Sequence, residues 1–334
     1  MPVLKPSRPI RVTGVVVIAA LCLAGCASGG EQIAERSQAG QSQAAPETMT
    51  VDNCGTEVDF AAAPERVVTI KSTSTEMLLA LGLQDRIVGT AFQDGPVPEQ
   101  WATKKALPVL ADRVPSQEVV LATAPDLVYA GWESNFSADG AGERNDLQAL
   151  GIATYVSPAA CKEADYQPER LSFDDIFAEI HEVARIFRAQ DKRLLAQQKA
   201  ELASIKPDDR GLSALWFSSG SDTPYVGAGI GAPQLILDTI GLTNIAEAVK
   251  DTWTPYSWES VIDANPDVIV LVDSTWNSAD KKIGILESNP VTAQLDAVKN
   301  HRYLIVPFAA SEAGVRTVSA AADLARQLSR LGGN

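Results

Sequence analysis

The sequence contains very little histidine. Only His181 and His301 occur in 334 residues, one inside a helical pattern and one in a turn before an apolar run, so we expect both to be structural. This scarcity disfavours His-rich manganese or zinc binding and a histidine-ligated haem site. It also disfavours hydrolases that pair a nucleophile with histidine, and neither G-x-S-x-G nor H-E-x-x-H is present. We therefore expect no metal site, no bound cofactor and no catalysis.

The sequence also lacks an apolar run long enough to cross a bilayer. The run Val15–Leu23 is too short, follows three cations and ends in Leu23-Ala-Gly-Cys26. This ending resembles the bacterial lipoprotein box, in which the cysteine is lipidated and the preceding segment removed; a plain secretory signal is the alternative. The resemblance implies a signal peptide over 1–25, lipidation of Cys26 and a tether over 26–49. The protein would then be anchored by lipid on the extracytoplasmic face of the cell membrane.

Basic residues are few. There are 28 against 42 acidic residues, a formal net charge of −14. Removal of residues 1–25, with three cations and no acids, takes this to −17. Such a charge argues against nucleic acid or an anionic membrane surface as partner, and it leaves room for a basic partner protein.

Cysteine is scarce as well. With Cys26 lipidated and Cys22 removed with the signal peptide, Cys54 and Cys161 remain in an exported chain. An oxidising compartment favours a disulfide between them. Two free or buried thiols are the alternative.

Glycine and proline are both missing between Leu171 and Pro207. Apolar residues recur there at helical spacing, and Ser172 can cap the start. This pattern predicts one uninterrupted helix from Ser172 to Lys206, roughly 50 Å long at 1.5 Å per residue.

The chain on the two sides of this helix repeats itself. Ser116–Ala130 and Ser257–Leu271 both read as a capped short helix, a Pro-Asp break and a buried strand. A second pair, Glu76–Leu83 and Leu235–Leu242, reads as a helix closed by glycine. Two repeats in the same order predict two similar α/β lobes joined by a rigid rod.

The expected boundaries follow from these repeats. We predict an N-terminal lobe over 50–165, a connecting helix within 166–206 and a C-terminal lobe over 207–334. Strands alternate with helices in both lobes, which predicts parallel sheets.

One protein family resembles this chain in four features taken together. These are the lipobox, the two lobes, the single connecting helix and the E-x-x-x-x-x-x-P-D pattern in each lobe. They resemble the solute-binding proteins of ABC importers of the iron-siderophore and cobalamin type, over about Thr50 to Leu331. The runs Thr69–Leu83 and Arg86–Phe92 resemble an actinobacterial subgroup proposed to take up a deazaflavin precursor of coenzyme F-420. The resemblance implies two Rossmann-like lobes with parallel sheets joined by one long rigid α-helix, as in class III periplasmic binding proteins.

A ligand would sit between the lobes, at the carboxyl ends of the strands. The hydroxyl-rich segment after the first buried strand suits an anion at a helix N-terminus, although simple capping explains it equally well. Aromatic residues fall in loops after strands, where a flat ligand could stack, and two arginines supply charge. The candidate ligand-binding residues are Lys71, Ser72, Thr73, Ser74, Thr75, Trp132, Arg144, Tyr225, Trp253, Tyr256, Trp276 and Arg316, with Phe136 a further loop aromatic. They predict an anionic, aromatic-containing organic ligand, either a ferric siderophore or a deazaflavin precursor.

Glu118 and Glu259 occupy matching places in the two repeats, each two residues after a capping serine. They either complement the helix dipole or make a two-point contact. The resemblance implies that they meet arginines of a membrane permease, with its ATPase subunit as a further partner, and that the carrier acts as a monomer. The alternatives are a membrane-anchored extracellular enzyme on a two-lobed fold and a purely structural lipoprotein.

Overall fold

The computed structural model describes residues 48–331. The predictions for the signal peptide, for Cys26 and for almost all of the tether lie outside these residues. An antiparallel hairpin comes first, formed by β1 (Met49–Asn53) and β2 (Thr56–Phe60). Cys54 and Gly55 in its turn both have positive φ, as tight hairpin turns require.

The N-terminal lobe is built on a five-stranded parallel sheet in the order β5-β4-β3-β6-β7. Its strands are β3 (Val67–Ile70), β4 (Ile87–Ala91), β5 (Val109–Ala111), β6 (Leu127–Ala130) and β7 (Ala153–Val156). Its helices are α1 (Ser72–Ala80), α2 (Gln117–Leu121) and α3 (Arg144–Ala149), with 3-10 helices at Gln84–Arg86, Glu99–Trp101, Glu133–Asn135, Pro158–Ala160 and Ala164–Tyr166.

The C-terminal lobe is built on a six-stranded sheet in the order β11-β9-β8-β12-β13, with β10 also paired to β8. Its strands are β8 (Ser213–Ser219), β9 (Tyr225–Gly227), β10 (Thr243–Asn244), β11 (Trp253–Pro255), β12 (Val268–Asp273) and β13 (Tyr303–Pro307). Its helices are α6 (Ala232–Ile240), α7 (Trp258–Ala264), α8 (Ala279–Ser288), α9 (Asp296–Lys299), α10 (Phe308–Ser311) and α11 (Thr317–Arg330), with a 3-10 helix at Thr292–Gln294.

The two sheets confirm the predicted α/β class, with one correction. The sheet of the C-terminal lobe is mixed, because β9 runs antiparallel to β8 and β11 antiparallel to β9. Only a short loop, 220–224, joins β8 to β9. A parallel pairing needs a crossover of a dozen or more residues, so this connection can only return antiparallel.

Both faces of each sheet are buried, which explains the continuous apolar runs of the strands. In β6, Leu127 and Tyr129 belong to one apolar cluster, whereas Val128 and Ala130 belong to the cluster on the other face. The strand β12 alternates in the same way between two clusters of the C-terminal lobe. Each sheet is therefore a rigid layer whose carboxyl edge holds the loops that follow it.

The predicted single helix from Ser172 to Lys206 is wrong. Two helices are present instead, α4 (Phe173–Ile186) and α5 (Lys192–Ser204). Ser172 does cap α4, and its hydroxyl accepts a hydrogen bond from the Asp175 N–H at 3.3 Å. The chain turns away from the first helix at Arg188, which lies just beyond the helix end and adopts φ of 52° in the left-handed region.

The termination of α4 is a Schellman motif made without glycine. The Ala189 N–H donates to the Ala184 carbonyl at 2.8 Å, and the Arg188 N–H donates to the Arg185 carbonyl at 3.1 Å. Asp191, at the start of α5, bonds His181 Nδ1 on α4 at 2.6 Å. Tertiary contacts thus turn the chain where the sequence carries neither of the usual helix-breaking residues.

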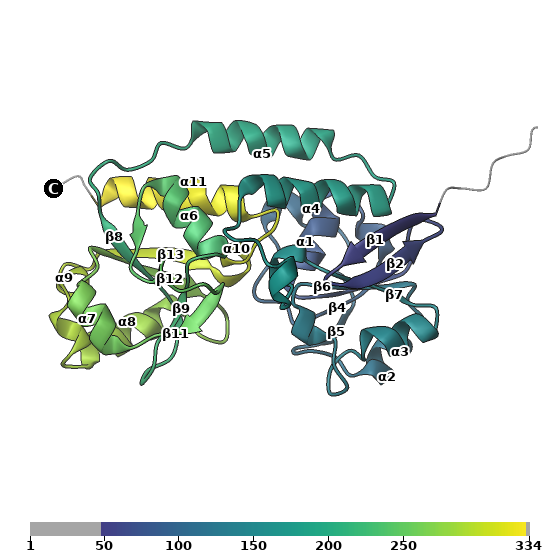
Figure 1. Cartoon of the computed structure of the whole chain (residues 1–334), viewed down its shortest axis with the longest axis horizontal. Coiled ribbons are helices and arrows are strands. Elements are labelled where there is room, and N and C mark those ends of the chain that lie inside the picture. The colour runs from purple at the N-terminus through teal and green to yellow at the C-terminus, as the bar shows by residue number, and fades with distance from the viewer. Residues whose placement is uncertain (1–47, 332–334) are drawn as a thin grey trace, which may run out of the picture. The chain divides into compact units, whose positions relative to one another are not determined.

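The connection is a helical hairpin, in which α5 runs back above α4 and α11 (Figure 1). The apolar face of α4 is buried in the core of the N-terminal lobe through Ile176, Ile180 and Val183. On α5, the buried Gln198 donates to the Val315 carbonyl of the C-terminal lobe at 2.8 Å. The lobes are therefore linked by the packing of this hairpin and not by the predicted single rod.

The predicted disulfide is present. Cys54 in the hairpin turn is bonded to Cys161 after β7, across 107 residues. In the loop-entropy model a bridge of this span stabilises the fold by about 4–5 kcal/mol. It fastens the hairpin to the segment that leads towards α4.

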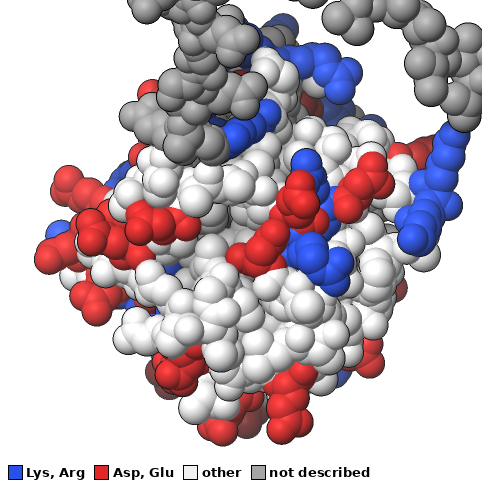
Figure 2. All heavy atoms as spheres, turned by 90° about the vertical axis from the view of Figure 1, so that its right-hand side faces the viewer, with Lys and Arg blue, Asp and Glu red and all other residues white. Residues whose placement is uncertain are grey.

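The surface reflects the acidic composition. On the face shown in Figure 2, acidic side chains lie along the left and lower margins, and further acidic side chains lie near the middle beside basic ones. Within residues 48–331, no helix has the length and apolarity needed to cross a membrane.

Replacing Arg188 by glycine tests the helix interruption. Glycine adopts the left-handed region without a Cβ penalty, so we expect Arg188→Gly to keep or raise the free energy of unfolding, by up to about 1 kcal/mol. Inside a continuous helix the same change would cost about 1 kcal/mol. Urea unfolding with the disulfide intact measures the sign, and Arg188→Ala, which retains the Cβ, is the control expected to gain nothing.

Two buried tyrosines hold α4 on the sheet of the N-terminal lobe. The Tyr129 hydroxyl donates to Glu179 at 2.9 Å, and the Tyr155 hydroxyl donates to Glu182 at 2.7 Å. Burial raises the pKa of Glu179 to about 7, although the hydrogen bond from Tyr129 opposes the shift. The carboxyl group of Glu179 is thus easier to protonate in the folded chain than in the unfolded one.

This shift makes stability depend on pH. A carboxyl group whose pKa is raised by folding stabilises the folded chain while the pH is below the group's ordinary pKa. For Glu179 this stabilisation is lost as the pH rises through about 7. A glutamine side chain at this position would remain neutral and accept the same Tyr129 bond. We expect Glu179→Gln to match the natural chain near pH 5 and to exceed it near pH 8.5 by up to about 3 kcal/mol. Denaturant unfolding at both pH values measures this, and a difference that does not grow with pH contradicts it.

Candidate ligand-binding site between the lobes

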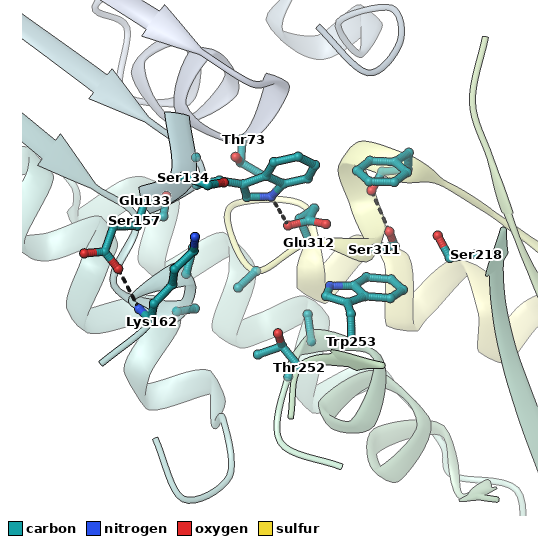
Figure 3. Close-up of a pocket in the computed structure, with 18 of the residues that line it drawn as sticks. Thr73, Glu133, Ser134, Ser157, Lys162, Ser218, Thr252, Trp253, Ser311 and Glu312 are labelled. Carbon is teal, nitrogen blue, oxygen red and sulfur yellow. Dashed lines mark hydrogen bonds between the residues drawn. The ribbon is translucent and has the colours of Figure 1, made fainter. Parts of the chain in front are cut away.

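A cavity of about 590 Å³ lies between the carboxyl edges of the two sheets. Residues that directly follow strands form its walls, so the sheets set its shape. Phe92 follows β4, Trp132 follows β6, Trp276 follows β12 and Phe308 follows β13. Figure 3 shows side chains from both lobes pointing into the same space.

Aromatic rings dominate the walls. The cavity is lined by Phe92, Trp132, Tyr225, Trp253, Trp276 and Phe308, and four of these were candidates from sequence (Trp132, Tyr225, Trp253, Trp276). Tyr225 and Trp253 stack with an interplanar angle of 10° and centroids 6.4 Å apart. Trp276 keeps 44% of its surface exposed although it is large and apolar, which is typical of a binding surface.

Lys71, a candidate from sequence, lies behind three of these rings and is not itself among the residues that line the cavity. Its ammonium is fully buried and paired with Asp94. The nitrogen lies 3.9 Å from the Trp132 ring centroid, 4.3 Å from that of Phe92 and 4.6 Å from that of Phe308. Burial lowers the pKa of Lys71 and raises the pKa of Asp94, and the attraction between the two charges opposes both shifts.

The backbone at Lys71 is strained. Its φ of 82° with ψ of 152° is a conformation that essentially only glycine adopts freely. The strain aims the side chain under Trp132, and Gly131 permits this approach, since a Cβ there would meet the Lys71 Cβ at 2.8 Å. A strained backbone conformation of this kind persists only where the surrounding structure holds it in place. Here that place is directly behind the cavity wall.

The predicted anion site at the start of α1 is only partly supported. Thr73 lines the cavity, but Ser72, Ser74 and Thr75 turn inward. The Ser74 hydroxyl donates to the Ile70 carbonyl at 2.8 Å. The carboxylate of Asp94 already accepts from the Ser72 N–H at 3.3 Å, so the helix N-terminus has its own internal anion.

Both predicted arginines lie outside this cavity. Arg144 is buried inside the N-terminal lobe, where it donates to Asn53 and Thr154 at distances between 2.8 and 3.3 Å. Arg316 forms an ion pair with Glu76 at 3.3 Å and faces a different hollow. Each was predicted as a ligand cation, and each instead satisfies a polar group of the fold.

Two predicted loop aromatics also lie elsewhere. Tyr256 donates its hydroxyl to the Ile245 carbonyl at 3.2 Å and lies at another surface hollow. Phe136 is buried in an apolar cluster of the N-terminal lobe. An aromatic residue that follows a strand therefore lines the cavity only when that strand ends at the edge of its sheet that faces the other lobe.

The charged residues that do line the cavity were not candidates. Arg113, Lys162 and Glu133 come from the N-terminal lobe, and Asp251 and Glu312 come from the C-terminal lobe. Lys162 directly follows Cys161 in the chain. The disulfide predicted from sequence could therefore have indicated where Lys162 lies. Glu312 follows the short helix α10 after the last strand, and sequence offered no comparable sign.

Two polar contacts cross between the lobes beside the cavity. The Trp132 indole N–H donates to Glu312 Oε2 at 2.9 Å. Arg316, at the start of α11, pairs with Glu76 on α1, and burial raises the pKa of Glu76 to about 7. Among residues 48–331, no group of three or more His, Cys, Asp or Glu is placed to hold a metal ion.

These features define a class: a two-lobed α/β binding protein with its site between the lobes. The chain matches the model of the periplasmic binding protein family over residues 67–310, and it belongs to that family.

Similar proteins agree with this assignment. The chain is 24% identical over 95% of its length to the uncharacterized ABC transporter substrate-binding lipoprotein YvrC of Bacillus subtilis, covering 96% of that protein. It is 24% identical over 63% of its length to the vitamin B12-binding protein of Pectobacterium carotovorum, covering 72% of it. The first is named as a substrate-binding protein of an ABC transporter and the second as a vitamin-binding protein, which leaves the enzyme alternative without support.

Solved structures show the same architecture. A periplasmic binding protein from Veillonella parvula is 28% identical with a TM-score of 0.73, covering 84% of this chain and 97% of that one. A protein of an ABC-type Fe3+-hydroxamate transport system from Saccharomonospora viridis is 26% identical with a TM-score of 0.71, covering 86% and 99%.

The buried pair beneath the cavity can be tested by a double-mutant cycle. Lys71→Met leaves the Asp94 charge buried without a partner, so we expect it to lower the free energy of unfolding by about 3–5 kcal/mol. Adding Asp94→Asn removes that charge and should recover most of the loss, since the asparagine oxygen still accepts from Ser72. Denaturant unfolding measures the cycle, and equal losses in the single and double variants would contradict the assigned pairing.

Proposed function

We propose that the chain is the extracytoplasmic substrate-binding lipoprotein of an ABC importer, which captures a small organic ligand between its lobes and delivers it to a permease. The observation that carries this proposal is the interlobe cavity with six aromatic rings drawn from both lobes. A cavity of about 590 Å³ suits a small molecule rather than a bare ion or a protein segment. Family membership and the name of the Bacillus subtilis relative support the transport role.

The ligand we favour carries a flat or apolar surface. A ferric siderophore meets this requirement, and the relative from an Fe3+-hydroxamate transport system supports it. The deazaflavin precursor remains the other candidate, supported by the ring-rich walls. An anionic group on either would be met by Arg113 and Lys162 at the N-terminal lobe, and not by the arginines expected from sequence.

The anchor and the assembly complete the proposal. Lipidation of Cys26 would hold the protein at the outer face of the cell membrane, and a relative named as a lipoprotein that matches 95% of the chain supports this. The carrier would act as a monomer that visits the permease and stimulates its ATPase subunit.

The docking proposal for Glu118 and Glu259 is supported by their placement. Both side chains are exposed, near the start of α2 and of α7, behind the capping residues Ser116 and Ser257. Each helix precedes a parallel strand, β6 or β12, so its start lies towards the carboxyl edge of the sheet. The two carboxylates therefore flank the edge where the cavity lies, one on each lobe, as a two-point contact needs.

Reversing both charges tests this role. Glu118→Arg with Glu259→Arg should leave the fold and ligand capture intact, because neither side chain lines the cavity, and it should abolish uptake and stimulation of the ATPase. Charged residues at the rim of an interface mainly guide how two proteins meet and align, and salt screens these charges. The contact between the natural protein and the permease should therefore also weaken as salt is added. Uptake in cells and ATPase activity in proteoliposomes measure both effects.

A matched control reverses two exposed carboxylates at the opposite edge. Asp85 precedes β4 and Asp209 precedes β8, so Asp85→Arg with Asp209→Arg makes the same change of net charge away from the proposed contact. We expect it to transport normally. Normal uptake by the Glu118 and Glu259 variant would refute the docking assignment.

A further inference from the structure

Glu312 is an acidic residue that lines the aromatic part of the cavity. It lies between α10 and α11, and Figure 3 shows its carboxylate in the middle of the space, with Thr73 on one side and Trp253 on the other. Trp132 on the facing lobe fixes its orientation through the 2.9 Å bond to Oε2. The side chain is thus held in place before any ligand arrives.

The second oxygen of this carboxylate is not used by the fold. Within the described part of the chain, Glu312 Oε1 accepts no hydrogen bond and Glu312 forms no ion pair, although a carboxylate can accept several bonds. A carboxylate in a ring-lined cavity costs free energy unless a donor meets it.

The nearby cation does not supply that donor. Lys71 attracts Glu312 electrostatically, but its ammonium is paired with Asp94 and enclosed by the Trp132, Phe92 and Phe308 rings. Burial raises the pKa of Glu312, while Lys71 and the Trp132 bond oppose the shift. The cavity therefore presents an acceptor that the protein itself leaves half satisfied.

We propose that Glu312 is a specificity-determining residue that binds a cationic or strongly donating N–H group of the ligand through Oε1. The proposal rests on the proposed function and narrows the ligand class. The ligand would place its conjugated or apolar body on the aromatic walls and a protonated amine, guanidinium or amide N–H on Glu312. An oxyanion would be repelled there, and any acidic group of the ligand would face Arg113 and Lys162 across the cavity.

A purely structural role is the competing explanation. In that case Glu312 serves only to bond Trp132 and hold the lobes together. Glu312→Gln separates the two roles, because the glutamine oxygen still accepts from the Trp132 indole while the negative charge is lost. An unchanged melting temperature and an unchanged Trp132 indole N–H signal, assigned by comparison with Trp132→Phe, would show that the interlobe bond survives.

The experiment uses two probes that share a benzene ring and a two-carbon chain, 2-phenylethylammonium and 3-phenylpropionate. Titrations are followed through the indole N–H signals of the tryptophans that line the cavity. We expect the ammonium probe to bind the natural protein about tenfold or more tightly than the carboxylate probe. Glu312→Gln should reduce this ratio to near one by weakening the ammonium probe alone.

Asp209→Asn is the matched control, because it removes an exposed carboxylate that lies outside the cavity. We expect it to change the ratio less than about twofold, since solvent screens that charge. The proposal is overturned if the natural protein binds both probes equally, prefers the carboxylate or fails to bind the ammonium probe, or if Glu312→Gln keeps the preference. These results are independent of uptake, so a failed docking test and a failed specificity test are distinguishable.

Discussion

The buried ammonium of Lys71 is the interaction on which the site depends. A lone charge at this depth would cost several kcal/mol, so the fold must bring Asp94 to it and surround the pair with polarisable rings. Those rings come from the ends of β4 and β6 and from the start of α10. The packing around Lys71 therefore positions the rings on this side of the cavity. It also places Phe308 of the C-terminal lobe against the N-terminal lobe.

The same region joins the lobes. Trp132 covers Lys71 with one face of its indole and donates its N–H to Glu312, while Arg316 and Glu76 pair nearby. The helical hairpin adds a further link, since α4 is buried against one lobe and α5 contacts the other. The lobes are thus joined both by contacts beside the cavity and by the helical hairpin.

Sequence reasoning predicted the elements whose signals are local. These include the caps at Ser116, Ser172 and Ser257 and the aromatic residues that follow strands at the facing edges of the lobes. The helix break at Arg188 was not, because a non-glycine residue takes the left-handed conformation under tertiary constraint. Lys71 looked like a ligand cation for a similar reason: its internal partner Asp94 lies 23 residues away, in a loop whose path sequence does not determine.

We infer that this protein carries an organic molecule without changing it. Native mass spectrometry of the protein purified from its own host tests this most directly, with Trp253→Ala as the comparison because Trp253 belongs to the cavity wall. We expect one non-covalent organic molecule per chain, which is released on denaturation, rebinds with its mass unchanged and is largely absent from the variant. Equal occupancy in the variant, or a bound molecule whose mass changes on incubation with the protein, would contradict it.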